Sequence, residues 1–269
     1  MPPAMDIWTA LTLDSEREAN RIVRFVRRQL ARTGRERVVL GLSGGIDSAL
    51  TALLCVRALG PDRVIAMALP HATSNPSSEK DARLLADQLG IKLTRFDITP
   101  MVEAMEQAYP NMGARRRGNI MARCRMTVLY DQSEAYKGLV VGASNRTEML
   151  LGYFTLYADN AAAFRPIGHL YKHQVRQLAR HLGAPEAILT KAPSADLWAG
   201  QTDEGELGFT YDQADQILYL LTECERTPSQ VVELGHSREL VDAVWGRMHW
   251  SVFKRREPPS LPTDNPCIL

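Results

Sequence analysis

The 269-residue chain is poor in features that mark several protein classes. It has four cysteines without a CxxC pair, and its formal net charge is +1. Such cysteines favour a reducing compartment over a disulfide-bonded scaffold or a zinc site. The near-neutral charge gives no reason to expect nucleic acid or an acidic membrane surface as a partner. The chain also lacks an apolar run of membrane-spanning length and an N-terminal secretion signal, so we expect a cytoplasmic protein.

Short apolar runs alternate with helical patterns along most of the chain. Runs rich in branched residues occupy positions 38–42, 64–69, 93–98 and 139–142. Helical patterns occupy positions 6–32, 47–59, 78–89, 100–109, 119–136, 146–153, 171–182, 211–221 and 238–250. This alternation predicts a Rossmann-like α/β fold with a parallel sheet. We predict one domain over residues 1–257, a mobile loop over 191–208, and an extended or disordered tail over 258–269.

The most informative segment is SGGIDS at positions 43–48, which follows the first apolar run and opens a helical one. Adjacent glycines let backbone N–H groups approach an anion, and the start of a helix adds partial positive charge. Asp47 would repel a bound phosphate unless a cation lies between them, so we predict that it binds Mg²⁺.

No Gly-Lys-Ser/Thr follows the two glycines, so the segment is not a Walker A loop. It resembles the loop of the ATP pyrophosphatases, which hold the β- and γ-phosphates of ATP while the α-phosphate is attacked. The residues predicted to bind ATP here are Gly41, Leu42, Ser43, Gly44, Gly45, Ile46, Asp47 and Ser48.

Further motifs lie behind this loop. They are GASNRTEMLLGYFTLYAD at 142–159, RPIGHLYK at 165–172 and KAPSADLWAGQTDE at 191–204. Glu148 begins the helix after the fourth predicted strand. Because neighbouring strand ends open on one crevice, its carboxylate could complete the cation site begun by Asp47. With these motifs in this order, the chain resembles NAD synthetase from about residue 38 to residue 211.

The resemblance implies a ligase that amidates deamido-NAD to NAD in two steps. The substrate carboxylate attacks ATP, giving an acyl adenylate and pyrophosphate, and ammonia then displaces AMP. It implies that Asp47 and Glu148 bind Mg²⁺, and that Lys172 and Ser194 contact ATP. Ser43 would act in catalysis by holding pyrophosphate. Asp159 matches an aspartate associated with ammonia and could accept a proton.

The residues matched to the acceptor substrate include departures from the family pattern. Arg123 matches an arginine that touches the dinucleotide. Leu156 replaces a lysine, Ala163 replaces an aspartate, and Phe253 replaces the histidine of a His-Lys pair that Lys254 completes. These changes leave open an alternative, a paralogue that uses the same adenylation on a different carboxylic acid.

Two smaller expectations concern the residues around these departures. Ala143 replaces a family threonine on the ATP side, and Arg165 could substitute for the lost lysine.

Near-neutral charge and the lack of a cysteine pair disfavour a tRNA-modifying or sulfur-transfer pyrophosphatase.

The resemblance also implies a homodimer. No glutaminase domain precedes the loop, so we expect either the form that uses free ammonia or a synthetase part that a partner supplies with ammonia. Candidates for the dimer interface are Leu11, Ile22 and Phe25, together with the segment 119–136.

Overall fold

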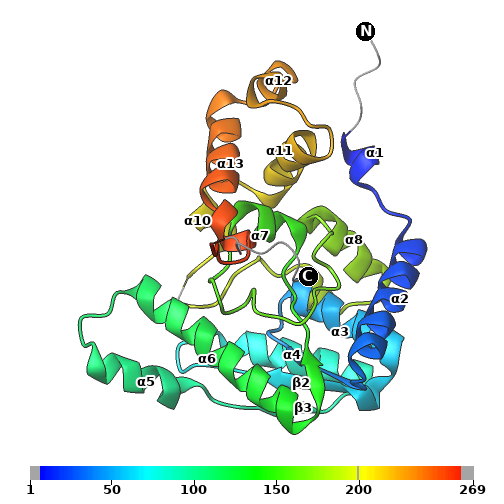
Figure 1. Cartoon of the computed structure of the whole chain (residues 1–269), viewed down its shortest axis with the longest axis vertical. Helices are drawn as coiled ribbons and strands as arrows, with labels where there is room; N and C mark the ends of the chain where they lie inside the picture. Colours follow the sequence, from blue (N-terminus) through cyan, green and yellow to red (C-terminus); the bar gives the residue numbers. More distant parts are fainter. Residues whose placement is uncertain (1–6, 199, 262–269) are drawn as a thin grey trace.

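The computed structural model describes residues 7–198 and 200–261. At its centre is a four-stranded parallel sheet in the order β3-β2-β1-β4 (Figure 1). The strands are β1 (Arg37–Gly41), β2 (Val64–Ala68), β3 (Leu93–Arg95) and β4 (Gly138–Val140). Val38 of β1 pairs with Val64 on one side and with Leu139 on the other. The predicted α/β fold with a parallel sheet is confirmed.

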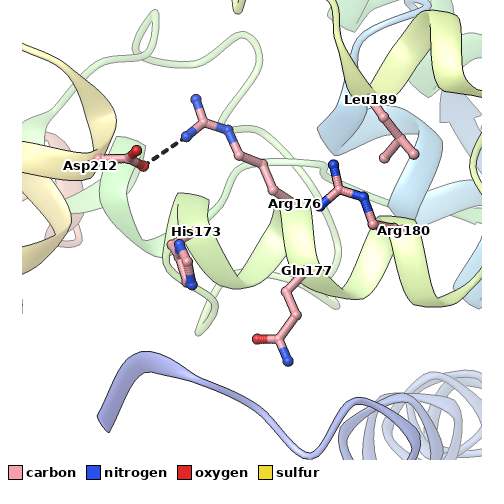
Figure 2. A pocket seen from close by; sticks show the side chains of 6 residues that line it. All are labelled: His173, Arg176, Gln177, Arg180, Leu189 and Asp212. Atoms are coloured by element: carbon pink, nitrogen blue, oxygen red, sulfur yellow. Dashed lines mark hydrogen bonds and ion pairs between the residues drawn. The ribbon is translucent and has the colours of Figure 1, made fainter. Parts of the chain in front are cut away.

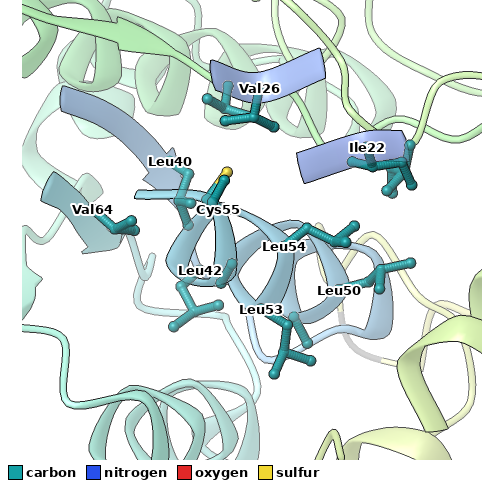
Figure 3. Close-up of a cluster of buried hydrophobic side chains, with 14 of the residues drawn as sticks. Ile22, Val26, Leu40, Leu42, Leu50, Leu53, Leu54, Cys55 and Val64 are labelled. Atoms are coloured by element: carbon teal, nitrogen blue, oxygen red, sulfur yellow. The ribbon is translucent and has the colours of Figure 1, made fainter. Parts of the chain in front are cut away.

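Helices cover both faces of the sheet. One face carries α2 (Ser15–Thr33), α3 (Ile46–Leu59), α4 (Pro76–Leu89) and α8 (Lys172–His181), and the other carries α5 (Thr99–Ala108) and α6 (Ala114–Ala135). Successive side chains of a strand point to opposite faces. Leu40 therefore lies in the cluster shared with α2 and α3 (Figure 3), whereas Val39 packs in the cluster that contains Met121 of α6.

A second apolar cluster contains no strand residue. It is formed mainly by α1 (Ile7–Leu11), α7 (Arg146–Leu151), α11 (Tyr211–Thr222), α12 (Pro228–Glu233) and α13 (Arg238–Trp250), and Leu207 also contributes to it. In Figure 1, α11, α12 and α13 lie together at the end of the molecule away from the sheet. The remaining short helices are α9 (Glu186–Leu189), α10 (Asp203–Leu207), η1 (Pro61–Arg63) and η2 (Val252–Arg255). Because α11 contacts both α7 and α8, this cluster touches helices that build the site described below.

The single helix predicted over 6–32 is wrong. Helix α1 ends at Leu11 and α2 begins at Ser15, while residue 6 lies outside the described residues. Asp14 caps α2 by accepting a hydrogen bond from the N–H of Arg17 at 3.0 Å. The side chain of Gln177 in α8 bonds both backbone polar groups of Leu13. A tertiary contact thus stabilises a break that the hydrophobic pattern did not reveal.

Part of the predicted dimer interface is also wrong. Leu11 is 0% exposed and Ile22 is 1% exposed, because both pack into the chain's own apolar clusters. The ring of Phe25 meets that of Phe164 edge to face, with centroids 5.9 Å apart. The amphipathic face of α2 is therefore used inside the subunit.

The segment 191–208, predicted to be a mobile loop, contains the short helix α10 and an internal set of hydrogen bonds. Ser194 Oγ donates to the carbonyl of Gln201 at 2.7 Å, and Gln201 Oε1 accepts from the N–H of Leu197 at 2.8 Å. Gln201 Nε2 in turn donates to Glu206 at 2.9 Å. Side-chain bonds of this kind order a backbone without sequence periodicity.

The tail predicted over 258–269 stays a prediction, because residues 262–269 lie outside the described part of the chain. Residues 258–261 have no regular secondary structure. Among the helices of residues 7–198 and 200–261, none is long and apolar enough to cross a membrane.

Candidate active site

The glycine loop leaves the carboxyl end of β1 and leads directly into α3. Gly44 has a φ of +75°, and a Cβ at this position would lie 2.2 Å from the carbonyl oxygen of Ser78. Only glycine satisfies both constraints. Gly45 is the N-cap of α3 and supplies no side-chain bond to the helix. The first N–H groups of α3 therefore have no side-chain cap and are suited to an anion.

Two serine hydroxyls fix the shape of the loop. Ser48 Oγ accepts from the N–H of Ser43 at 3.2 Å and donates to the carbonyl of Gly45 at 2.9 Å. The hydroxyls of Ser43 and Ser48 lie 3.0 Å apart. Ser48 is buried and Ser43 is exposed, so the hydroxyl of Ser43 is the one open to a ligand.

Lys172 joins this loop to a second strand end. Its side chain is 1% exposed, and its Nζ lies 2.5 Å from Asp47 Oδ2 and 3.1 Å from Glu148 Oε1. The ammonium also lies 4.7 Å from the ring centroid of Tyr211. Asp47, Glu148 and Lys172 belong to the first turns of α3, α7 and α8. Three helix N-termini, each with partial positive charge, thus converge at one point.

The electrostatics of this group follow from its burial. Burial alone would lower the pKa of Lys172, but the carboxylates of Asp47 and Glu148 outweigh it and raise that pKa. Burial raises the pKa of Glu148 to about 8, and the charge of Asp47 adds to the effect. The charge of Lys172 acts in the opposite direction and favours the ionised form of Glu148.

The same two carboxylates fit a Mg²⁺ ion in their chemistry. Asp47 and Glu148 each direct one oxygen at the Lys172 ammonium, so both can reach a common cation. Within residues 7–198 and 200–261 no cluster of three or more metal-binding side chains occurs. Mg²⁺ is typically held by one or two carboxylates together with waters and substrate phosphates, so two protein ligands are sufficient.

The segment 191–204 lies beside the glycine loop. Lys191 Nζ is 2.8 Å from Asp81 Oδ2 and 3.2 Å from Ser78 Oγ, both at the start of α4. Asp196 accepts from the N–H of Asn75 at 3.0 Å. Ser78 is the residue whose carbonyl excludes a side chain at Gly44. Ser194, predicted to contact ATP, is therefore in a segment docked next to the loop.

The residues predicted to bind the acceptor gather around the chain that follows α7. Arg123 Nη2 donates to the carbonyl of Leu156 at 3.2 Å. Lys254 Nζ donates to the carbonyl of Gly152 at 2.6 Å and also to that of Phe154. Each cation is thus held by backbone oxygens, which leaves its positive charge uncompensated by these contacts.

Three other predicted residues lie in different surroundings. Asp159 Oδ1 accepts from the N–H of Thr155 at 2.8 Å. The N–H of Ala163 donates to the carbonyl of Val140 at 2.9 Å, which extends the edge of the sheet beside β4. Phe253 is 65% exposed.

The model of the NAD synthase family matches residues 18–258. The chain belongs to the NAD synthase family.

Individual relatives agree with this assignment. The chain is 48% identical over 248 residues to the NH(3)-dependent NAD(+) synthetase of Trichlorobacter lovleyi, covering 92% of this chain and 91% of the relative. NMN synthetase from Francisella tularensis has a TM-score of 0.84 and 32% identity, covering 94% of this chain and all of the neighbour. NH3-dependent NAD synthetase from Campylobacter jejuni has a TM-score of 0.80 and 33% identity, covering 93% and 100%.

One residue of this NAD synthase site, Asn145, links the two carboxylates and was not predicted from the sequence. Asn145 is fully buried, and its Nδ2 donates to Asp47 Oδ1 at 2.8 Å. It also caps α7, with its side chain accepting from the N–H of Glu148 and its own N–H donating to the Glu148 carboxylate. Asn followed three residues later by Glu is the signal that predicts such a reciprocal cap.

A cavity of about 310 Å³ opens beside α8, apart from the residues predicted to form the NAD synthase site. His173, Arg176, Gln177, Arg180, Leu189 and Asp212 line it (Figure 2). None of the predicted site residues is among them. Arg176 is paired with Asp212 at 2.8 Å in this cavity.

Proposed function

We propose that this chain is an ammonia-dependent NAD synthetase, which uses ATP to convert deamido-NAD to NAD. The observation that carries the proposal is the buried ammonium of Lys172 between Asp47 and Glu148, at the end of the glycine loop. Free backbone N–H groups, helix N-termini and a lysine together match the charge of a polyphosphate. The relatives known as NH3-dependent NAD synthetases support ammonia as the nitrogen source and NAD as the product.

The first step proposed is adenylation. An oxygen of the acceptor carboxylate forms a bond to the α-phosphorus of ATP, and the bond from that phosphorus to the bridging oxygen breaks. The N–H groups around Gly44 and Gly45, the hydroxyl of Ser43 and the ammonium of Lys172 hold the departing pyrophosphate and offset its charge. Mg²⁺ held by Asp47 and Glu148 would neutralise further negative charge on the phosphates.

The second step proposed is amide formation. Ammonia attacks the acyl carbon, and the bond from that carbon to the AMP oxygen breaks. We assign Asp159 the role of accepting the proton that the attacking nitrogen loses. Its Oδ1 already accepts from the N–H of Thr155, which fixes the orientation of the carboxylate. Ser194 would contact ATP from the docked segment 191–204.

The acceptor is proposed to lie over the chain after α7. Arg123 and Lys254 are held there by backbone carbonyls and offer positive charge to the phosphates of a dinucleotide. Leu156 would lie in the same region, because Arg123 bonds its carbonyl, whereas Ala163 and Phe253 would meet the acceptor from the sheet edge and from the exposed surface. Gly152 is the C-cap of α7 and follows Glu148 by four residues, so this region begins about one helical turn from the nucleotide site.

We also propose that the enzyme is a homodimer. Helix α6 remains a candidate contact surface, and its Tyr130 is 42% exposed. Light scattering at micromolar concentration should report twice the chain mass. A monomer under these conditions would contradict the proposal.

A product assay tests the proposed reaction. The purified enzyme should convert ATP, deamido-NAD and ammonium to AMP, pyrophosphate and NAD, and omission of ammonium should prevent NAD formation. Nicotinate mononucleotide in place of deamido-NAD tests the alternative acceptor raised by Leu156, Ala163 and Phe253. Formation of ADP and phosphate would overturn the assignment.

A further inference from the structure

Asp215 of α11 is a fully buried carboxylate that none of the roles above uses. Its Oδ1 accepts from the hydroxyl of Thr147 at 2.5 Å, and its Oδ2 accepts from the backbone N–H of His173 at 2.7 Å. One carboxylate from α11 therefore bonds two other helices at once.

The two bonded positions immediately precede and follow site residues. Thr147 precedes Glu148 in the first turn of α7, and His173 follows Lys172 in the first turn of α8. The network closes on itself, because the hydroxyl of Thr147 accepts from the N–H of Lys172 at 3.0 Å while donating to Asp215. These bonds hold two backbone N–H groups at the start of α8 and the side chain of Thr147 at the start of α7, the helix starts that present the site lysine and the site carboxylate.

A buried carboxylate is an expensive way to join helices. Burial raises the pKa of Asp215 to about 6, so its ionised form is disfavoured in this environment. Apolar residues of similar volume commonly replace buried ionic groups without loss of stability. The same two helices, α8 and α11, are also joined at the surface by Arg176 and Asp212. Helix packing alone therefore does not account for a carboxylate at position 215.

We propose that Asp215 is a positioning residue that sets the separation of Glu148 and Lys172 by holding the starts of α7 and α8. The inference rests on the proposed function for the role of those two side chains. Asp215 itself touches neither the nucleotide nor the metal. It acts through the hydroxyl of Thr147 and the backbone N–H of His173, the residues beside Glu148 and Lys172.

The test compares Asp215→Asn with Asp212→Asn. Both substitutions remove one charge from α11 at its contact with α8, but only the first replaces an acceptor of the network that includes α7 by an amide N–H, which would have to donate to the hydroxyl of Thr147. Thr147→Val is a second variant, which removes the hydroxyl between Asp215 and Lys172 and keeps the side-chain shape. Asp212→Asn should keep wild-type turnover, since Asp212 lies at the protein surface with a side chain 54% exposed.

Three measurements separate positioning from a general loss of folding. We expect Asp215→Asn and Thr147→Val to lower kcat for pyrophosphate release by about 10- to 100-fold, with KM for ATP little changed. Mn²⁺ affinity, read without turnover by its paramagnetic resonance signal, should fall by about the same factor. Amide hydrogen exchange in peptides that cover residues 171–175 should accelerate. The double variant should be no worse than the worse single one, because both break one network.

The outcomes are distinguishable. If Asp215→Asn matches Asp212→Asn in kcat, Mn²⁺ affinity and amide exchange, the positioning role is overturned. If Asp215→Asn fails to fold, Thr147→Val is compared with Asp212→Asn in the same three measurements, and equal values overturn the positioning role. A wild-type enzyme that releases no pyrophosphate would overturn the proposed function instead, and it would do so without any reference to the variants.

Discussion

The nucleotide end and the acceptor end of this site differ in how their charges are compensated. At the nucleotide end, the ammonium of Lys172 is buried between Asp47 and Glu148. At the acceptor end, Arg123 and Lys254 bond backbone carbonyls. In the first arrangement each charged side chain has a partner of opposite charge. The second keeps positive charge available for an anionic ligand.

This difference separates chemistry from specificity. Adenylation needs the same charges at the same positions for any acceptor, so a buried and fully paired group is suitable. The residues proposed to recognise the acceptor lie outside this buried group, and Phe253 among them is exposed. Substitutions at these positions leave the buried group intact, which explains how Leu156, Ala163 and Phe253 can depart from the family pattern while Asp47, Glu148 and Lys172 do not.

The largest effect should come from removing the shared cation. Lys172→Met leaves two buried carboxylates to repel each other and removes positive charge from the departing pyrophosphate. We expect kcat for pyrophosphate release to fall by about 10²- to 10³-fold, equivalent to roughly 3–4 kcal/mol. Arg180→Met on the same helix is the matched control and should be near wild type. If Lys172→Met is as active as Arg180→Met, the buried ammonium is not needed for catalysis. The contrast between the nucleotide end and the acceptor end would then be lost.

The next effect is on stability and depends on pH. The folded-state pKa of Asp215 is raised from 3.8 to about 6 by burial, with the bonds from Thr147 and His173 opposing that rise and with Asp212 and Arg176 as the nearby charges. A raised pKa contributes stability below about pH 4, and this is lost as pH rises through 6. Urea unfolding of wild type relative to Asp215→Asn should show a loss of about 3 kcal/mol across this window. If the free energies of unfolding of wild type and Asp215→Asn change with pH in parallel, the raised pKa of Asp215 is contradicted.

Gly44→Ala tests whether the loop is rigid because of its packing. The φ of +75° and the carbonyl of Ser78 at 2.2 Å from the added Cβ should together cost about 1–3 kcal/mol and displace the loop, which lowers pyrophosphate release. Gly34→Ala is the control, since Gly34 has a φ of +66° but no atom within 4 Å of its Cβ. It should lose some stability and keep activity. If both variants lose activity, the strain of a side chain at positive φ is enough to explain the loss, and the contact with Ser78 is not needed.

The smallest effect should occur at the acceptor end. We expect the combined change of Leu156→Lys, Ala163→Asp and Phe253→His to raise kcat/KM for deamido-NAD by about 10-fold, the value of one added charge-assisted hydrogen bond. Steady-state kinetics with deamido-NAD and with nicotinate mononucleotide measure the change and its selectivity. If the triple variant has an unchanged kcat/KM for both substrates, the three substitutions relative to the family pattern have no effect on acceptor choice. The acceptor end would then tolerate less functional change than the comparison of the two ends implies.

Much of the nucleotide end was predictable from the sequence. The strand, the glycine loop and the start of α3 are contiguous, so one local pattern predicted where Ser43, Gly44 and Asp47 lie in the fold, while their roles stay predictions. The parallel sheet followed from alternating runs and helices. The break at Asp14 escaped prediction because the side chain of Gln177 from α8 satisfies the backbone there. The helix α10 escaped because side chains, rather than a periodic pattern, order its surroundings.

The sequence by itself determined the local elements of the site: a loop that admits only glycine, a reciprocal cap between Asn145 and Glu148, and the helix starts that carry partial positive charge. Only the tertiary structure decided which of these meet. Asp47 lies 125 residues from Lys172, and Thr147 lies 68 residues from Asp215. Contacts over such separations leave no periodic trace in a single chain, because they are set by how helices pack on a sheet and on one another.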